Sequence, residues 1–318
     1  MILPIVSLIF GLTILIGWAD ILVRGASSLA KKLGISSLVI GLTIVAFGTS
    51  MPELIVSFLA SFQWNSDIAL GNVVGSNVAN ILLILGLTSV IALIPVAHST
   101  VWKEIPFSLL AILALGFLGA DTYLGNTNNN LISRWDGAVL LLFFAIFLYY
   151  VYTISRWESN DDTGIKKYSI PLSTFFIMGW LLGLFFGGKM FVDGAVAIAR
   201  TFGMSEMVIG LTIVAVWTSL PELATSVIAA RKWHNDIAVG NIVGSNIFNI
   251  FWILGFSSIV TPIRILDTVS FIDMLVCLFA TIVLFFALFI GKKNALERWQ
   301  GVAFILLYIA YTWYLIVR

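Results

Sequence analysis

Long apolar runs separated by short polar stretches occupy most of the chain. Many of these runs have the roughly 20 residues that a helix needs to cross a bilayer, and few of them carry any charge. Ten such runs cover residues 1–19, 33–62, 68–97, 105–120, 137–155, 168–188, 207–230, 237–261, 274–291 and 299–317. They lack the short alternation of a membrane β-barrel, and backbone inside lipid has to satisfy its own hydrogen bonds. The pattern therefore predicts an all-α polytopic membrane protein with ten transmembrane helices.

Composition supports a membrane protein and excludes several other classes. Apolar residues make up 60% of the 318 residues and charged residues only 10%, whereas soluble domains have about a quarter charged residues. The net charge of +1 excludes a nucleic-acid binder that relies on bulk positive charge. A single cysteine, Cys277, excludes a disulfide framework and a Cys-based metal cluster. The first run has no basic segment before it and no cleavage site, so we expect it to be a retained span.

Basic residues orient the predicted bundle, because cytoplasmic loops of membrane proteins are enriched in Lys and Arg. With the N-terminus outside, the loops that face the cytoplasm carry 12 of the 17 basic residues and the other side carries 5. The charge distribution therefore predicts that both termini lie outside.

The two halves of the chain repeat each other at an offset of 169 residues (203 − 34). Over residues 34–86 and 203–255, 32 of 53 aligned positions are identical, and these include Gly, Thr, Ser, Pro, Glu and Asn in register. Each half holds five predicted spans, and an odd number inverts the second half relative to the membrane. We therefore expect two inverted five-helix repeats, residues 1–154 and 170–318, joined by a polar cytoplasmic linker, 155–169. Inverted repeats are typical of secondary transporters, whose binding site lies near the midplane.

Two glutamates, Glu53 and Glu222, occupy matched positions within long apolar spans. A carboxylate at the bilayer centre costs about 2.5–3.5 kcal/mol on insertion scales. A purely structural interpretation is that each glutamate is a buried carboxylate hydrogen-bonded to a neighbouring residue. The surrounding residues suit a cation better. Pro52 and Pro221 precede the glutamates, and proline frees a carbonyl on the preceding turn.

Neutral oxygen donors surround both glutamates in the sequence. The candidate ligands are carbonyls near Ala46, Thr49, Ala215 and Thr218, and side-chain oxygens of Thr49, Ser50, Ser76, Asn80, Thr218, Ser219, Ser245 and Asn249. Hard oxygen ligands select calcium, sodium, magnesium or manganese over zinc and copper. The two histidines, His98 and His234, lie at loop edges and are predicted to be inert. Asp67 and Asp236 are predicted to be helix N-caps.

The motifs GTSMPEL and WTSLPEL, followed by GNVVGSN and GNIVGSN, resemble the two alpha-repeats of the cation/calcium exchanger superfamily. The resemblance is closest to the prokaryotic sodium/calcium exchanger type and extends over nearly the whole chain. It implies that Glu53 and Glu222 coordinate the transported ion, with the oxygen donors above as further ligands. It also implies exchange of Ca²⁺ for Na⁺ or H⁺ across a prokaryotic plasma (inner) membrane, in which helices one and six move across a core of helices two, three, seven and eight.

Two departures from the family pattern bear on this expectation. Family members often have an acid at the position of Asn249 or of its counterpart Asn80, and here both are amides, which leaves ion stoichiometry and coupling open. Trp217 replaces the glycine whose counterpart is Gly48. Its ring either crowds one access path or packs against neighbouring helices.

Other functions remain as alternatives at this point. The same glutamates suit an antiporter for another divalent ion or a cation channel, and flux with and without a sodium gradient separates a channel from an antiporter. An intramembrane enzyme is disfavoured because HExxH, a Ser–His pair and a paired aspartate motif are missing from the sequence. No Walker A motif is present, so an ATP-driven pump is not supported. We expect no cofactor, no nucleic acid and no obligate protein partner. The expected partners are inorganic cations and the lipid bilayer.

Overall fold

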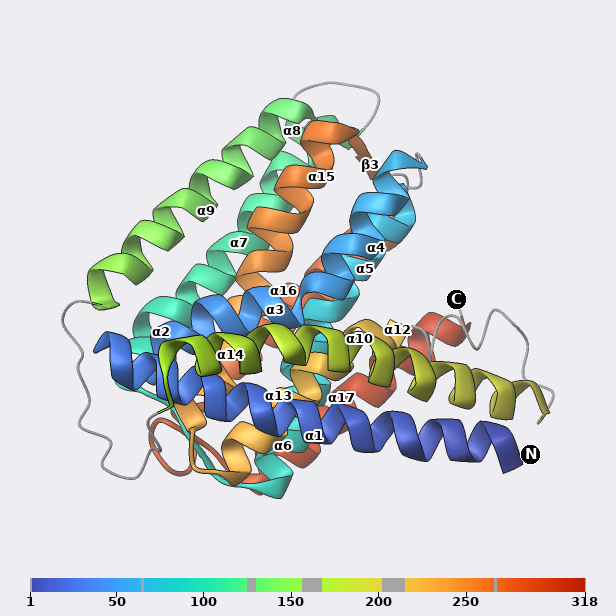
Figure 1. Cartoon of the computed structure of the whole chain (residues 1–318). Coiled ribbons are helices and arrows are strands. Elements are labelled where there is room, and N and C mark those ends of the chain that lie inside the picture. The colour runs from blue at the N-terminus through green and yellow to red at the C-terminus, as the bar shows by residue number, and fades with distance from the viewer. Residues whose placement is uncertain are drawn as a thin grey trace.

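A computed structural model describes residues 2–63, 66–124, 130–155, 168–201, 215–265 and 268–317 (Figure 1). In the first half the helical segments are α1 (Ile2–Leu33), α2 (Ser37–Ile40), η1 (Gly41–Val45), α3 (Ala46–Thr49), α4 (Met51–Phe62), α5 (Ser66–Val78), η2 (Ala79–Leu85), α6 (Gly86–Ile91), η3 (Thr100–Glu104), α7 (Ile105–Leu118), α8 (Asp121–Leu124) and α9 (Arg134–Ser155). In the second half they are α10 (Ile170–Thr201), α12 (Ala215–Thr218), α13 (Leu220–Arg231), α14 (Asn235–Ile247), η5 (Phe248–Leu254), α15 (Gly255–Val260), α16 (Thr268–Ala287) and α17 (Arg298–Val317). The η segments are π-helical.

Two short antiparallel strand pairs join connections from opposite halves of the chain. Strand β1 (Ile94–Pro95) pairs with β4 (Ala295–Leu296), and β2 (Asn130–Ile132) pairs with β3 (Ile263–Ile265). Each pair therefore ties the first half to the second at one end of the helices.

Many of the described helices are long and apolar enough to span a membrane. Six meet this requirement, or seven if the bent pair Ser37–Thr49 and Met51–Phe62 counts as one span. Ile170–Trp180 and Phe271–Ala287 are shorter apolar helices. Residues 207–214 of the predicted run 207–230 lie outside the described residues. The structure confirms an all-helical multi-span protein, and the number ten stays a prediction.

A sharp bend interrupts the helix that carries Glu53. Helix α3 ends at Thr49, α4 begins at Met51, and the two directions differ by 47°. Pro52 lies in the first turn of α4, where its missing N–H costs no intrahelical hydrogen bond, whereas a continuous helix would lose one. The break therefore lies at the proline that precedes Glu53.

The two long helices α1 and α10 form an antiparallel pair. The Ser7 hydroxyl donates to the Met190 carbonyl at 2.9 Å near one end, and the hydroxyls of Ser28 and Ser173 lie 3.2 Å apart near the other. Figure 1 shows the pair running crosswise to α7 and α9. A Cβ on Gly11 would lie 2.7 Å from the Gly187 carbonyl, so glycine allows the two backbones to approach this closely.

The centre of the molecule is α14, in which the residues from Ile237 to Ile247 are all buried. Two glycines of α14 face the helical segments α2 and η1 of the first half. A Cβ on Gly244 would lie 2.9 Å from the Leu42 carbonyl, and one on Gly240 would lie 3.0 Å from the Leu38 carbonyl. Small residues therefore bring α14 against α2 and η1 and place the polar residues of both halves at one centre.

The sequence repeat is matched by the helix bounds. At the offset of 169, α4 corresponds to α13, α5 to α14, η2 to η5 and α6 to α15 with identical limits. Helix α6 packs on α17 at Gly86 and Gly301, and its equivalent α15 packs on α9 at Gly255 and Gly137. Each half therefore contributes its last helix to the other half.

The prediction that Asp67 and Asp236 are N-caps is wrong. Helix α5 begins at Ser66 and α14 begins at Asn235, with His234 as its N-cap residue. Asp236 therefore lies in the first turn of α14, where a negative charge still interacts favourably with the helix dipole.

Candidate ion-binding site

Both glutamates lie in the first turn of a helix that starts inside the protein. Glu53 follows the break before α4 and is 1% exposed, and Glu222 holds the equivalent position in α13 and is 0% exposed. Exposed amides at the start of each helix favour a negative charge there. The same break that exposes these amides thus sets the position of each carboxylate.

Hydroxyl groups from both halves of the chain bind the Glu53 carboxylate. Ser76 of α5 donates to Glu53 Oε1 at 3.4 Å, and Ser219, which directly precedes α13, donates to the same oxygen at 3.3 Å. The first donor comes from the repeat that carries Glu53 and the second comes from the other repeat.

The Glu222 carboxylate has the equivalent partners. Ser245 of α14 donates to Glu222 Oε1 at 3.2 Å, and Ser50, at the break before α4, also donates at 3.2 Å. Each carboxylate is therefore held by a serine from the opposite repeat. This crossing brings Glu53, Glu222 and all four serines predicted from the sequence to one centre.

Four buried oxygens at matched repeat positions have no hydrogen-bond donor. They are Oε2 of Glu53, Oε2 of Glu222, Oδ1 of Asn80 and Oδ1 of Asn249. A buried acceptor without a donor is costly, and a charged one more so. A cation is the group that satisfies such oxygens. Within the described residues no three of His, Cys, Asp and Glu gather into a metal site. The ligands available to a cation here are therefore two carboxylates and neutral oxygens.

The predicted ligands Thr49, Thr218 and Ala46 lie beside this centre. The Thr49 hydroxyl donates to Asn241 Oδ1 at 2.9 Å, and Thr218 donates to Asn72 Oδ1 at 3.5 Å. The Ala46 carbonyl accepts from the Ser50 amide at 3.0 Å. Ala215 begins α12, next to residues 202–214, which are outside the described part of the chain. Coordination by these carbonyls stays a prediction.

Asn72 and Asn241 support the broken helices from behind. The Asn72 amide donates to the Glu53 carbonyl at 3.1 Å and to the Ser57 hydroxyl at 2.9 Å. Asn241 donates to the Glu222 carbonyl at 3.5 Å and to Ser226 at 3.0 Å. The bonds to the Glu53 and Glu222 carbonyls attach the backbone of each glutamate to the next helix. Both asparagines are identical in the repeats, which is the signal that would have singled them out.

Asn77 and Asn246 are the residues that sequence reasoning missed. Both are buried, and both hydrogen-bond across the repeats to Asn249 and Asn80 respectively. They stand in the repeated GSN motifs, but a single sequence does not reveal which of two neighbouring asparagines faces the ion.

Trp217 lies in α12 and is partly buried against an apolar cluster that includes Leu22 and Val23 of α1 and Trp180 of α10. Helices α1, α10, α13 and α14 all contribute residues to this cluster. This position favours the packing interpretation, and the cluster includes residues of the helices expected to move.

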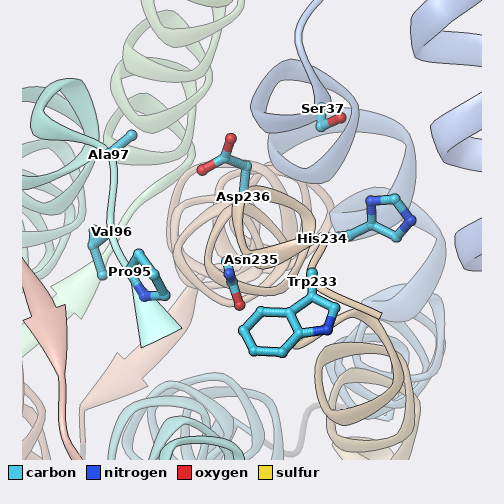
Figure 2. Close-up of a pocket in the computed structure, with 8 residues that line it drawn as sticks. All are labelled: Ser37, Pro95, Val96, Ala97, Trp233, His234, Asn235 and Asp236. Atoms are coloured by element: carbon cyan, nitrogen blue, oxygen red, sulfur yellow. The ribbon is translucent and has the colours of Figure 1, made fainter. Parts of the chain in front are cut away.

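A separate pocket of about 390 Å³ lies between β1, the start of α2 and the connection from α13 to α14. Figure 2 shows the side chains of His234 and Asp236 pointing in different directions around it. The two side chains do not converge on a point, so the pocket adds no metal site to the molecule.

The chain is similar to known membrane proteins over most of its length. The model of the family described as sodium/calcium exchanger protein matches residues 3–153 and again 172–317. The chain is 38% identical to inner membrane protein YrbG of Escherichia coli K12, over 82% of this chain and 81% of that protein. It is 32% identical to sodium/calcium exchanger MaX1 of Methanosarcina acetivorans, over 96% of both chains.

The chain is also similar to solved structures. A structure of the sodium–calcium exchanger NCX_Mj soaked with Na⁺ and Sr²⁺ superposes with a TM-score of 0.81, at 33% identity, over 97% of both chains. The chain therefore belongs to the sodium/calcium exchanger protein family and is an integral membrane cation antiporter rather than an enzyme.

Proposed function

We propose that this antiporter exchanges Ca²⁺ for Na⁺, or for H⁺, at the centre formed by Glu53 and Glu222. The observation that carries the proposal is the set of four buried oxygens without donors, two from carboxylates and two from amides. Two negative charges neutralise one Ca²⁺, and the neutral oxygens replace part of its hydration shell. Na⁺ or H⁺ competes for the same oxygens on the return step.

The proposed ligand set is the one that the sequence predicted. It comprises the side chains of Glu53, Glu222, Ser50, Ser76, Asn80, Ser219, Ser245 and Asn249 with oxygens of Ala46, Thr49, Ala215 and Thr218. The cross-repeat serine bonds and the buried free oxygens support this assignment.

The proposed topology is ten transmembrane helices in two inverted repeats, 1–154 and 170–318, with linker 155–169 in the cytoplasm. Equal helix bounds at the offset of 169 support a repeat, and the antiparallel course of the equivalent helices α1 and α10 supports inversion. The family model matches each half separately, which is also expected of a repeat.

We assign the protein to a prokaryotic inner membrane with both termini outside. The excess of Lys and Arg in the loops assigned to the cytoplasm supports this orientation. The relative YrbG is named as an inner membrane protein.

Alternating access would carry the ion between the two sides of the membrane. The close antiparallel packing of α1 and α10 supports their movement as one unit across the remaining helices. The central helices α14, η1 and α4 would then keep the ligand geometry fixed.

Uptake of isotope-labelled Ca²⁺ into proteoliposomes tests the site and the coupling together. We expect uptake to need an outward gradient of Na⁺ or H⁺, and Glu53→Gln or Glu222→Gln to abolish it because each removes half of the charge that compensates Ca²⁺. Size-exclusion profiles and melting curves of the purified variants control for folding. Normal uptake by either variant would refute the site, and uptake without any counter-ion gradient would indicate a channel.

A further inference from the structure

A buried amide presents either its oxygen or its N–H₂ group to a neighbouring cation, and only the oxygen binds one. A carboxylate has no such choice because both of its ends are oxygen. The proposed site uses amides, Asn80 and Asn249, at positions where an acid would need no orientation. Something in the fold must therefore fix which end of each amide faces the ion.

A chain of two hydrogen bonds fixes which way the Asn80 amide is turned. Asn80 Nδ2 donates to Asn246 Oδ1 at 2.9 Å, and Asn246 Nδ2 donates to the backbone carbonyl of Asn77 at 3.5 Å. A backbone carbonyl only accepts, so Asn246 has to turn its Nδ2 towards it. Its Oδ1 then faces Asn80, and Asn80 has to turn its own Oδ1 away from Asn246.

A second, equivalent chain of hydrogen bonds fixes the orientation of the Asn249 amide. Asn249 Nδ2 donates to Asn77 Oδ1 at 3.0 Å, and Asn77 Nδ2 donates to the backbone carbonyl of Asn246 at 3.1 Å. All four amides are at most 2% exposed, so water does not replace these partners. Each chain ends at an oxygen without a donor, Oδ1 of Asn80 in one and Oδ1 of Asn249 in the other.

Reversing an amide in either chain creates a repulsive contact. A reversed Asn80 would set its oxygen against Asn246 Oδ1, and reversing both would set Asn246 Oδ1 against the Asn77 carbonyl. Buried acceptors that face each other lose a hydrogen bond and leave both groups unsatisfied. The main chain therefore determines the polarity of both amides.

We propose that Asn77 and Asn246 are positioning residues that fix the amides of Asn249 and Asn80 with their oxygens towards the transported cation. Each acts on the ligand of the opposite repeat, and neither touches the ion itself. This inference rests on the proposed function, because it assumes that Asn80 and Asn249 are ligands.

The test uses the difference between an amide and a carboxylate. Asn246→Ala frees the Asn80 amide to rotate, and we expect the Ca²⁺ concentration for half-maximal uptake to rise about tenfold, the size of effect that follows when roughly one hydrogen-bonded ligand is lost. On an Asn80→Asp background the same change should raise it less than about twofold, because Asp presents oxygen in either orientation. The pair Asn77→Ala and Asn249→Asp repeats the experiment on the other chain.

Controls separate positioning from packing. Gln300 is a buried amide that donates to the carbonyls of Ala287 and Ile290, and Gln300→Ala should lose stability without any rescue by Asn80→Asp. Asn246→Ser replaces Asn246→Ala if the latter does not fold. An equal rise on both backgrounds would overturn the proposal while leaving the site intact, provided that Glu53→Gln abolishes uptake. Uptake that survives Glu53→Gln would instead overturn the site.

Discussion

In the proposed site, Asn249 is a neutral side chain beside two carboxylates. Replacing it with Asp adds a third carboxyl beside Glu53 and Glu222, and like charges make such a group take up a proton more readily. We expect Asn249→Asp to fold and to show stronger inhibition of Ca²⁺ uptake at low pH than the parent protein. Uptake measured across a pH series in proteoliposomes checks this. A pH profile equal to that of the parent would mean that Asn249 does not face the ion.

Trp217 gives a second prediction at the scale of one residue. The ring packs against the cluster that α1 and α10 contribute to, while its counterpart Gly48 has no side chain. We expect Trp217→Gly to change the maximal exchange rate more than the Ca²⁺ concentration for half-maximal uptake, because the ring packs on a cluster that includes residues of the helices expected to move. Kinetics in right-side-out and inside-out vesicles check this. Unchanged kinetics in both orientations, or loss of folding, would make Trp217 ordinary packing.

Sequence reasoning found the residues whose chemistry is unusual for their surroundings. Glu53 and Glu222 were identifiable because a carboxylate in a long apolar run needs a reason, and the repeat paired them. Asn77 and Asn246 were not, because their role depends on contacts between the two repeats. The N-cap prediction for Asp236 failed for a local reason, since α14 begins at Asn235, two residues earlier than an N-cap at Asp236 requires.

The contact between α1 and α13 is the element-scale feature that no sequence pattern predicted. Asp20 of α1 pairs with Arg24 on its own helix at 2.6 Å, as the spacing predicts, and also with Lys232 at the end of α13. The second ion pair joins the helix pair expected to move to the helix that carries Glu222. Its side chains are 31% and 25% exposed, so solvent weakens it.

Removing the Asp20–Lys232 ion pair should make it easier for the protein to leave the conformation that the structure describes. We expect Lys232→Gln to raise the maximal exchange rate by up to about fivefold, since a partly exposed pair contributes about 0.2–1 kcal/mol. Arg24→Gln is the matched control, because it removes a charge that pairs within α1 and should leave the rate unchanged. Stopped-flow or filter assays of Na⁺-dependent uptake measure both. Equal effects of the two variants would mean that surface charge, and not this contact, sets the rate.

The broken helices were predictable and the π-helical segments were not. Pro52 and Pro221 mark the breaks directly in the sequence. The segments η2 and η5, which carry Asn80 and Asn249, have ordinary helical sequences. Such segments are frequent at functional sites, but they arise from packing and polar contacts between helices, which one sequence does not contain.

At the scale of the whole molecule, the two repeats form one site because they interpenetrate. Helices α9 and α17 each pack on the opposite half, the strand pairs join the halves at both connections, and each glutamate is bound by the other half's serine. Helices α1 and α10 form a glycine-packed pair that crosses other helices and contacts the core at α13 (Figure 1). This arrangement supports the proposed division into a core that keeps the ligands in place and a pair that moves.

Cross-linking tests this division. Ser28 and Ser173 have hydroxyls 3.2 Å apart between α1 and α10, so Ser28→Cys with Ser173→Cys should form a disulfide on a Cys277→Ala background, from which the sole native cysteine is removed. If α1 and α10 move as one unit, oxidation should leave most Na⁺-dependent Ca²⁺ uptake intact. Asp20→Cys with Lys232→Cys, bridged by a short bifunctional maleimide, ties α1 to α13 and should arrest uptake. Arrest by the Ser28–Ser173 disulfide would mean that α1 and α10 slide past each other during transport, and uptake that persists with α1 tied to α13 would mean that the moving unit lies elsewhere.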